Sequence, residues 1–193
     1  MSQNNNFFNN NPFSKPCEMA INGHLYKVRT NFKDWIKVIL LYGDKTIPND
    51  LKIEMLLKLA FVDEIKEYDG EFIKAINSFL NCGEEVKEEK EKNKLYDFKQ
   101  DWDYIYSAFM QQYKIDLNES KMHWFDFIKL FKGLSNETEF VKIIGYRGVN
   151  LNEIKDKDQK KYYRKLKERY ALEDEYKTED CLFDESILES FKR

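Results

Sequence analysis

The stretch from Asp97 to Arg147 constrains the fold most, because it carries two successive apolar stripes at helical spacing. In each half, large apolar side chains recur at steps of three and four residues, which places them on one face of a helix. The first stripe consists of Phe98, Trp102, Ile105, Phe109 and Tyr113, and the second of Trp124, Phe127, Ile128, Phe131 and Leu134. We therefore predict two helices, over 98–113 and up to Lys132, whose stripes pack against each other.

The rest of the chain predicts further helices and one small hairpin. Asn22-Gly23 is a strong hairpin signal, because both residue types tolerate positive φ. Apolar periodicity and capping residues predict helices over 32–42 (capped by Thr30 or Asn31), from 49 to about 61, and from Asp69-Gly70 to Gly83. Capping boxes are predicted at Asp116 with Glu119, and at Ser135 or Asn136 with Glu139, the last for a helix to about Tyr146. The fold class is mainly α, a single helical domain of about six to eight helices with an N-terminal β-hairpin.

Composition divides the chain into five segments. Residues 1–17 are an Asn-rich head that we expect to be disordered, and 18–83 hold the hairpin and the first helices. Residues 84–96 are a charged linker or an exposed helix extension. Residues 97–175 form the aromatic helical core with a basic terminal helix, and 176–193 are an acidic amphipathic tail.

Composition also excludes several function classes. Among 193 residues, 42% are hydrophobic and 35% charged, which fits a soluble globular chain. The net charge of −3 argues against a chain-wide nucleic-acid or anionic-membrane surface. No apolar run approaches the roughly 20 residues that span a bilayer. Cys17, Cys82 and Cys181 are scattered and, with His24 and His123, form no metal-ligand pattern; such cysteines fit a reducing cytosol.

Asp101 and Asp103 with His123 could form a metal or acid–base set. The stronger interpretation is structural, because the first turn of a helix favours negative charge. His123 would then be a core-edge residue that donates a hydrogen bond, and Arg147 would pair with one of the two aspartates. We therefore expect no catalytic, cofactor-binding or metal-binding residue.

Three surfaces remain as candidates for partner binding. A second row on the 98–113 helix, Tyr104, Ala108 and Gln111, is a candidate contact face. The tail contributes Leu182, Phe183 and Ile187, which could dock on the chain itself, on a neighbouring copy or on a client. The basic segment 155–170 is interpreted first as a terminal helix packed by its aromatic residues, second as a contact for an acidic protein, and last as a nucleic-acid site.

The chain also resembles the bacteriophage gene-product-fifteen family of long-tailed phages and prophages of Gram-positive bacteria, over roughly Met19 to Glu175. Its signature residues here are Asp101, Tyr106, Phe109, His123, Trp124, Phe131 and Arg147. They lie in the motifs Tyr104-Ile105-Tyr106, Ala108-Phe109, Ile115-Asp116-Leu117, His123-Trp124, Leu130-Phe131, Gly133-Leu134 and Tyr146-Arg147. The chain departs from the family at Phe125, where a tryptophan is common, and at Lys114, where a glycine is common.

This resemblance implies a non-enzymatic tail assembly chaperone acting in the host bacterial cytoplasm. Such a protein coats the helical tape-measure protein, shields its apolar stripe, brings in other tail proteins and is displaced as the tail tube polymerises. Coating a rod implies many copies, which could also associate as a homo-oligomer. The alternatives are a permanent structural component of the tail or virion and, ranked last, a nucleic-acid-binding protein that uses the basic helix 155–170.

Overall fold

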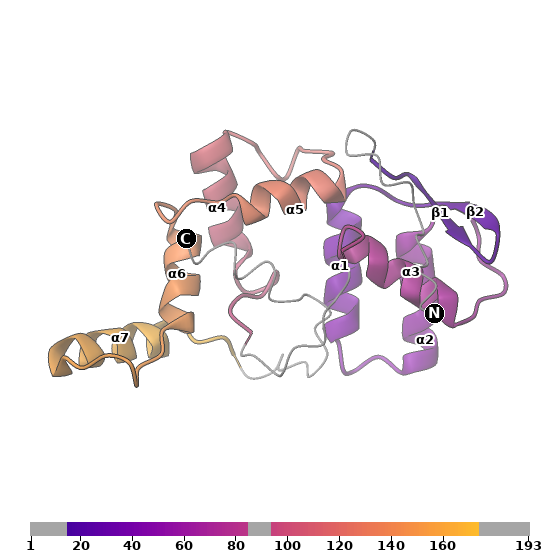
Figure 1. The fold of residues 1–193 in the computed structure, drawn as a ribbon. Helices are drawn as coiled ribbons and strands as arrows, with labels where there is room; N and C mark the ends of the chain where they lie inside the picture. Colours follow the sequence, from indigo (N-terminus) through magenta and orange to yellow (C-terminus); the bar gives the residue numbers. More distant parts are fainter. Residues whose placement is uncertain (1–14, 85–93, 174–193) are drawn as a thin grey trace. The chain divides into compact units, whose positions relative to one another are not determined.

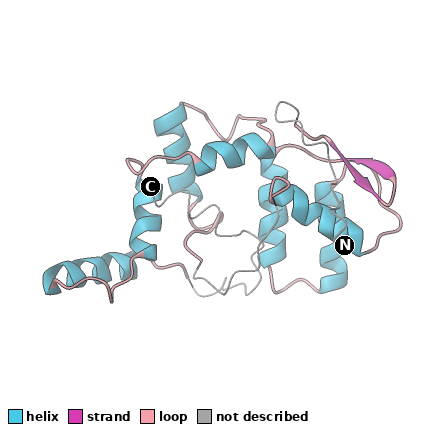
Figure 2. Cartoon of the chain, viewed as in Figure 1, coloured by secondary structure: helices cyan, strands magenta, loops and turns pink. Residues whose placement is uncertain are grey.

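The computed structural model describes residues 15–84 and 94–173 (Figure 1). Within these ranges the chain is mainly α, with a small N-terminal hairpin, which confirms the predicted fold class (Figure 2). The elements in chain order are β1 (Glu18–Ile21), β2 (His24–Lys27), α1 (Phe32–Gly43), α2 (Asn49–Ala60), α3 (Gly70–Leu80), α4 (Trp102–Tyr113), α5 (Trp124–Lys132), α6 (Glu139–Gly148) and α7 (Lys157–Arg169).

The described residues group into two compact units, and the chain passes between them more than once. The first unit contains residues 15–84 and returns at Lys121–Lys129. The second contains residues 94–120 and 130–173. The division falls inside α5, so that residues 124–129 belong to the first unit and 130–132 to the second.

In the first unit, the hairpin forms where the Asn-Gly pair predicted it. Asn22 has a φ of 51° and Gly23 of 81°, the left-handed conformations that a two-residue turn requires. The strands are antiparallel, with Ala20 opposite Leu25. Met19 and Ile21 point to the inner face, where both are fully buried, and β1 packs against α3. The hairpin is stabilised by this contact, since a two-stranded ribbon alone is marginal in water.

Two helices of the first unit, α1 and α3, begin at capping residues that the sequence indicated. The Asn31 side chain accepts a hydrogen bond from the Lys33 backbone N–H at 3.0 Å and starts α1. The Asp69 carboxylate accepts from the Glu71 N–H at 2.9 Å and starts α3. Each cap satisfies a backbone donor that the helix itself cannot.

Part of the second apolar stripe lies in the core of this first unit. The Phe127 ring stacks on Phe32 with 4.7 Å between ring centroids. The Trp124 indole N–H donates to the Leu80 carbonyl oxygen at 3.1 Å. We had predicted that the whole stripe packs against the 98–113 stripe. That prediction was incomplete, because periodicity shows which face of a helix is apolar but not which partner covers it.

The second unit has its own aromatic core around the end of α5. Phe131 is fully buried, and its ring centroid lies 5.3 Å from Tyr96, 5.5 Å from Phe98 and 5.3 Å from Phe140. Aromatic pairs at such distances add specific contacts to the burial of apolar area. Helix α6 packs against both α4 and α7.

Three helix starts in the second half of the chain differ from the prediction. Helix α4 begins at Trp102 rather than near Phe98. The reason is local: the Asp97 carboxylate accepts from the Lys99 and Gln100 N–H groups, at 2.7 and 2.9 Å, which closes a turn before the helix. Phe98 is therefore buried from this turn and not from the helix.

The two predicted capping boxes are also wrong. Asp116 accepts from the Asn118 N–H at 2.8 Å and forms a turn, and α5 begins later, at Trp124. Helix α6 begins after Thr138, whose hydroxyl donates to the Ser135 carbonyl oxygen at 2.8 Å. In both places a short polar side chain bonds to nearby backbone without making the predicted helix cap. Such side chains can form either a turn or a cap.

Candidate functional site

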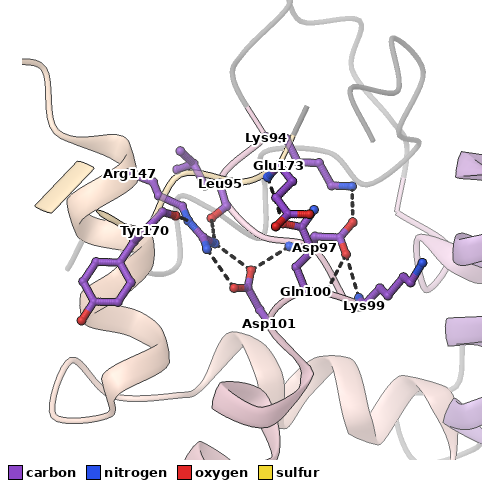
Figure 3. A network of polar contacts seen from close by, with 9 residues as sticks. All are labelled: Lys94, Leu95, Asp97, Lys99, Gln100, Asp101, Arg147, Tyr170 and Glu173. Carbon is purple, nitrogen blue, oxygen red and sulfur yellow. Dashed lines mark hydrogen bonds and ion pairs between the residues drawn. The ribbon is translucent and has the colours of Figure 1, made fainter. Parts of the chain in front are cut away.

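A buried ion pair joins α6 to the start of α4 (Figure 3). The Arg147 Nη1 and Nη2 atoms donate to the two carboxylate oxygens of Asp101, at 2.7 and 2.8 Å. Asp101 is 1% exposed and Arg147 9%. Asp101 is the residue before the first turn of α4, and its side chain makes no helix-cap hydrogen bond. The predicted pairing of Arg147 with an aspartate is confirmed, and the partner is Asp101.

Arg147 also donates to two backbone carbonyl oxygens. Nη1 also donates to the Leu95 carbonyl oxygen at 2.9 Å, and Nε donates to the Tyr170 carbonyl oxygen at 2.5 Å. Asp101 in turn accepts from the Asp97 backbone N–H at 2.9 Å. One guanidinium thus ties together α6, the start of α4, the segment before α4 and the residue after α7. A buried ion pair needs such additional bonds to offset its desolvation.

Asp97 extends this network (Figure 3). Besides the two N–H groups of the turn before α4, its carboxylate accepts from Lys94 Nζ at 2.6 Å. Burial alone would raise the pKa of Asp97, but the hydrogen bond and charge of Lys94 and the backbone N–H groups of Gln100 and Lys99 outweigh it and lower that pKa. The Gln100 side chain accepts from the Glu173 N–H at 3.0 Å, which holds the chain after α7 against this segment. The network is therefore a structural hub that fixes α4.

His123 lies in the first unit and serves as a cap. Its Nδ1 accepts from the Phe125 N–H at 3.1 Å, and its Nε2 lies 3.0 Å from the Pro16 carbonyl oxygen. Both contacts are satisfied together by the neutral ring protonated at Nε2. Burial lowers the pKa of His123, which favours that form. The imidazole is thus a hydrogen-bonded part of the fold, as the structural interpretation predicted.

Metal and acid–base roles gain no support from these groups. Asp101 is fully engaged by Arg147, and His123 by the backbone. Within residues 15–84 and 94–173, no group of three or more His, Cys, Asp or Glu side chains is placed to hold a metal ion.

The outward side of α4 is the best-defined candidate contact surface. Tyr104 is 37% exposed, and Gln111 is also exposed, as expected for a contact row. Ala108, which we placed in the same row, is only 2% exposed and belongs to the core. The predicted row is therefore not exposed along its whole length, because position 108 faces the neighbouring helix. The exposed side of α4 runs through positions 103, 107 and 110 instead. We define this arc as the α4 face; its members are Asp103, Tyr104, Ser107, Met110 and Gln111.

Few charges lie on the α4 face. Asp103 is its single charged residue, although 35% of the residues of the whole chain are charged. Met110 is 37% exposed and was missed by our sequence reasoning, although its helical position relative to Asp103 and Ser107 could have placed it there. The centres of protein-binding surfaces are enriched in tyrosine and methionine and depleted in lysine, glutamate, aspartate and serine. Tyr104 and Met110 fit that composition, whereas Asp103 and Ser107 do not.

The other signature residues belong mainly to the core. Phe109, Trp124 and Phe131 are fully buried, and Tyr106 is half-buried. They identify the fold without marking a reactive site. The tail residues Leu182, Phe183 and Ile187 lie outside the described residues.

The chain matches the model of a known protein family. The family model described as "Bacteriophage Gp15 protein" matches residues 14–172, which is most of the chain. The protein belongs to the bacteriophage Gp15 family. No curated protein and no solved structure matches it. The Gp15 match includes Asp101 and Arg147 of the hub, the α4 face and α7, and it ends before the acidic tail.

In this Gp15-family protein, none of the helices in the described ranges is both long and apolar enough to cross a membrane.

Proposed function

We propose that this Gp15-family protein is a non-enzymatic tail assembly chaperone that binds the tape-measure protein in the host cytoplasm and promotes assembly of the tail tube. The proposal rests on membership of a phage family together with one structural observation, the exposed and charge-poor α4 face. A chaperone for a rod-like apolar client needs such a surface, since burial of apolar area is the driving force for the contact.

The small size of the α4 face suits reversible binding. Five residues of one helix bury far less than the roughly 800 Å² per partner of a stable interface. A single copy would therefore bind weakly, whereas many copies along one helical client would hold it through avidity. Subunits of the growing tube could then displace the copies one at a time.

The hub supports this surface. Asp101 immediately precedes α4, and its bonds to Arg147 fix the helix relative to α6. A contact face on a helix that is fixed at its base loses little conformational entropy when it binds. We therefore place the client contact on Tyr104, Met110 and Gln111, with Arg147 acting only through the position of α4.

The experiment is co-expression with the tape-measure protein of the same phage. A chaperone should raise the soluble fraction of the tape-measure protein and co-purify with it; if neither occurs, the chaperone function is wrong.

Purified virions separate the chaperone from the alternative of a permanent tail component. Mass spectrometry should detect tail proteins in the particles but not this chain. Its presence in stoichiometric amounts would favour the structural role instead.

A further inference from the structure

The basic helix α7 has an exposed, cationic outer face for which the structure shows no partner. Residues 157–169 contain seven basic and two acidic side chains, for a net charge of +5. No residue of α7 is buried. None of its basic side chains is ion-paired with a carboxylate of the described ranges. Such a concentration of positive charge on a chain with a net charge of −3 can attract an acidic segment.

The outer face combines charge with an apolar anchor. Lys161, Lys165 and Arg169 follow one another at four-residue steps and are all exposed, so they line one side of the helix. Tyr162 lies beside them and is 58% exposed. Its ring meets that of Tyr163 edge-on, at 5.5 Å between centroids. This side of α7 therefore suits a segment that is acidic and carries apolar side chains.

We propose that residues 174–193 of the same chain occupy this face. They contain seven acidic and three basic side chains, for a net charge of −4, which complements the +5 of α7. Their apolar residues can cover Tyr162; these are Leu182, Phe183, Ile187, Leu188 and Phe191. The proposal does not depend on the chaperone function.

The attachment point and the length of the segment make the contact feasible. The Tyr170 carbonyl oxygen is held by Arg147, and the Glu173 N–H by Gln100, so the segment starts close to the C-terminal end of α7 (Figure 3). Twenty residues reach up to about 65 Å when extended, whereas α7 is only about 20 Å long. The segment can therefore run back along the whole helix.

Tethering favours this occupant over others. A segment attached a few residues from its site has an effective concentration on the order of millimolar, which a free acidic peptide or nucleic acid in solution must exceed. Because the attraction is largely between exposed charges, it weakens as salt rises. The basic face is thereby shielded from phosphates in the free protein.

The test uses the full chain with a spin label on Cys181. Replacing Cys17→Ser and Cys82→Ser leaves Cys181 as the single labelling site. Backbone amide signals are then assigned by NMR, and paramagnetic broadening is measured for α7, at low and at high salt. Mixing labelled protein with unlabelled, isotope-enriched protein separates contacts within one chain from contacts between copies.

The expected result is strong broadening of the amides from Lys161 to Arg169, within one chain, that declines at high salt. It should be lost in K161E/K165E and retained in K121E/K142E, which changes the net charge equally at two exposed lysines elsewhere. Circular dichroism would confirm that both variants keep their helices. Absence of broadening at α7, broadening that is the same in both variants, or broadening only between copies would each overturn the proposal.

Discussion

Arg147 meets Asp101 through two parallel hydrogen bonds, of 2.7 and 2.8 Å, inside the second unit. The pair joins residues that are 46 positions apart in the chain and that belong to α6 and to the start of α4. Because the guanidinium also binds the carbonyl oxygens of Leu95 and Tyr170, the loss of one side chain affects four segments. We expect this hub to be the most sensitive polar site of the second unit.

Replacing Arg147→Met should reduce the free energy of unfolding by about 3–5 kcal/mol, because it leaves the Asp101 carboxylate buried without its partner. Chemical denaturation measures the change. The double variant R147M/D101L should recover part of the loss, since it removes the uncompensated charge as well. As a control, Lys37→Met removes an exposed ion pair with Asp34 and should change stability by under about 1 kcal/mol. An R147M protein as stable as K37M would contradict the structural role of the hub.

Replacing Lys114 by glycine should increase the stability of the protein, whereas replacing Arg147 should reduce it. It ends α4 in the left-handed conformation, with a φ of 57°, where a side chain is strained and glycine is not. Lys114→Gly should therefore stabilise the protein by about 0.5–1 kcal/mol, measured as an increase in denaturation midpoint. The matched change Ser107→Gly lies inside the same helix and should destabilise by about 0.5 kcal/mol. Destabilisation by both changes would show that the left-handed cap costs nothing.

The burial of His123 predicts that the free energy of unfolding depends on pH. Burial lowers its pKa in the folded chain, so the unfolded chain takes up the proton more readily. The stability associated with the neutral ring is present above the unfolded pKa of about 6.5 and is lost as the pH falls from there through the lowered folded pKa. His123→Asn keeps a capping side chain without this titration.

The measurement is the free energy of unfolding of wild type and H123N at pH 7.5 and at pH 5.5. Wild type should lose more stability than H123N over this interval. His24→Asn changes an exposed histidine on the hairpin and should follow wild type. Equal losses in wild type and H123N would show that His123 does not carry the effect.

Local signals in the sequence predicted the elements that are decided locally. Asn22-Gly23, Asn31 and Asp69 each determine a turn or a cap through their own backbone or nearest neighbours, and all three predictions are confirmed. The pairing of Arg147 with Asp101 or Asp103 was also predicted, and the structure shows that Asp101 is the partner.

Competing local bonds and tertiary contacts explain the errors. Asp97 and Asp116 close turns where we predicted helix, because a carboxylate can bond to a nearby N–H in either conformation. Ala108 was assigned to the outward row, but α4 presents positions 103, 107 and 110 to solvent instead. Sequence periodicity gives the angular position of each residue around a helix. Only packing decides which side of the helix is covered by its neighbours.

The α4 face should tolerate substitution without loss of the fold. Tyr104→Glu with Met110→Glu changes two side chains that are each 37% exposed, so the free energy of unfolding should change by under about 1 kcal/mol. Urea denaturation measures it. Loss of several kcal/mol would mean that these side chains support the core and would remove them as a contact surface.

The most direct test of the proposed chaperone function is the soluble fraction of the tape-measure protein during co-expression with these variants. Wild type should keep the tape-measure protein soluble, whereas Y104E/M110E should reduce that fraction several-fold and abolish co-purification. The control L51E/V62E places the same charges at two exposed apolar positions of the first unit and should behave as wild type. If Y104E/M110E protects the tape-measure protein as well as wild type does, the client does not bind the α4 face.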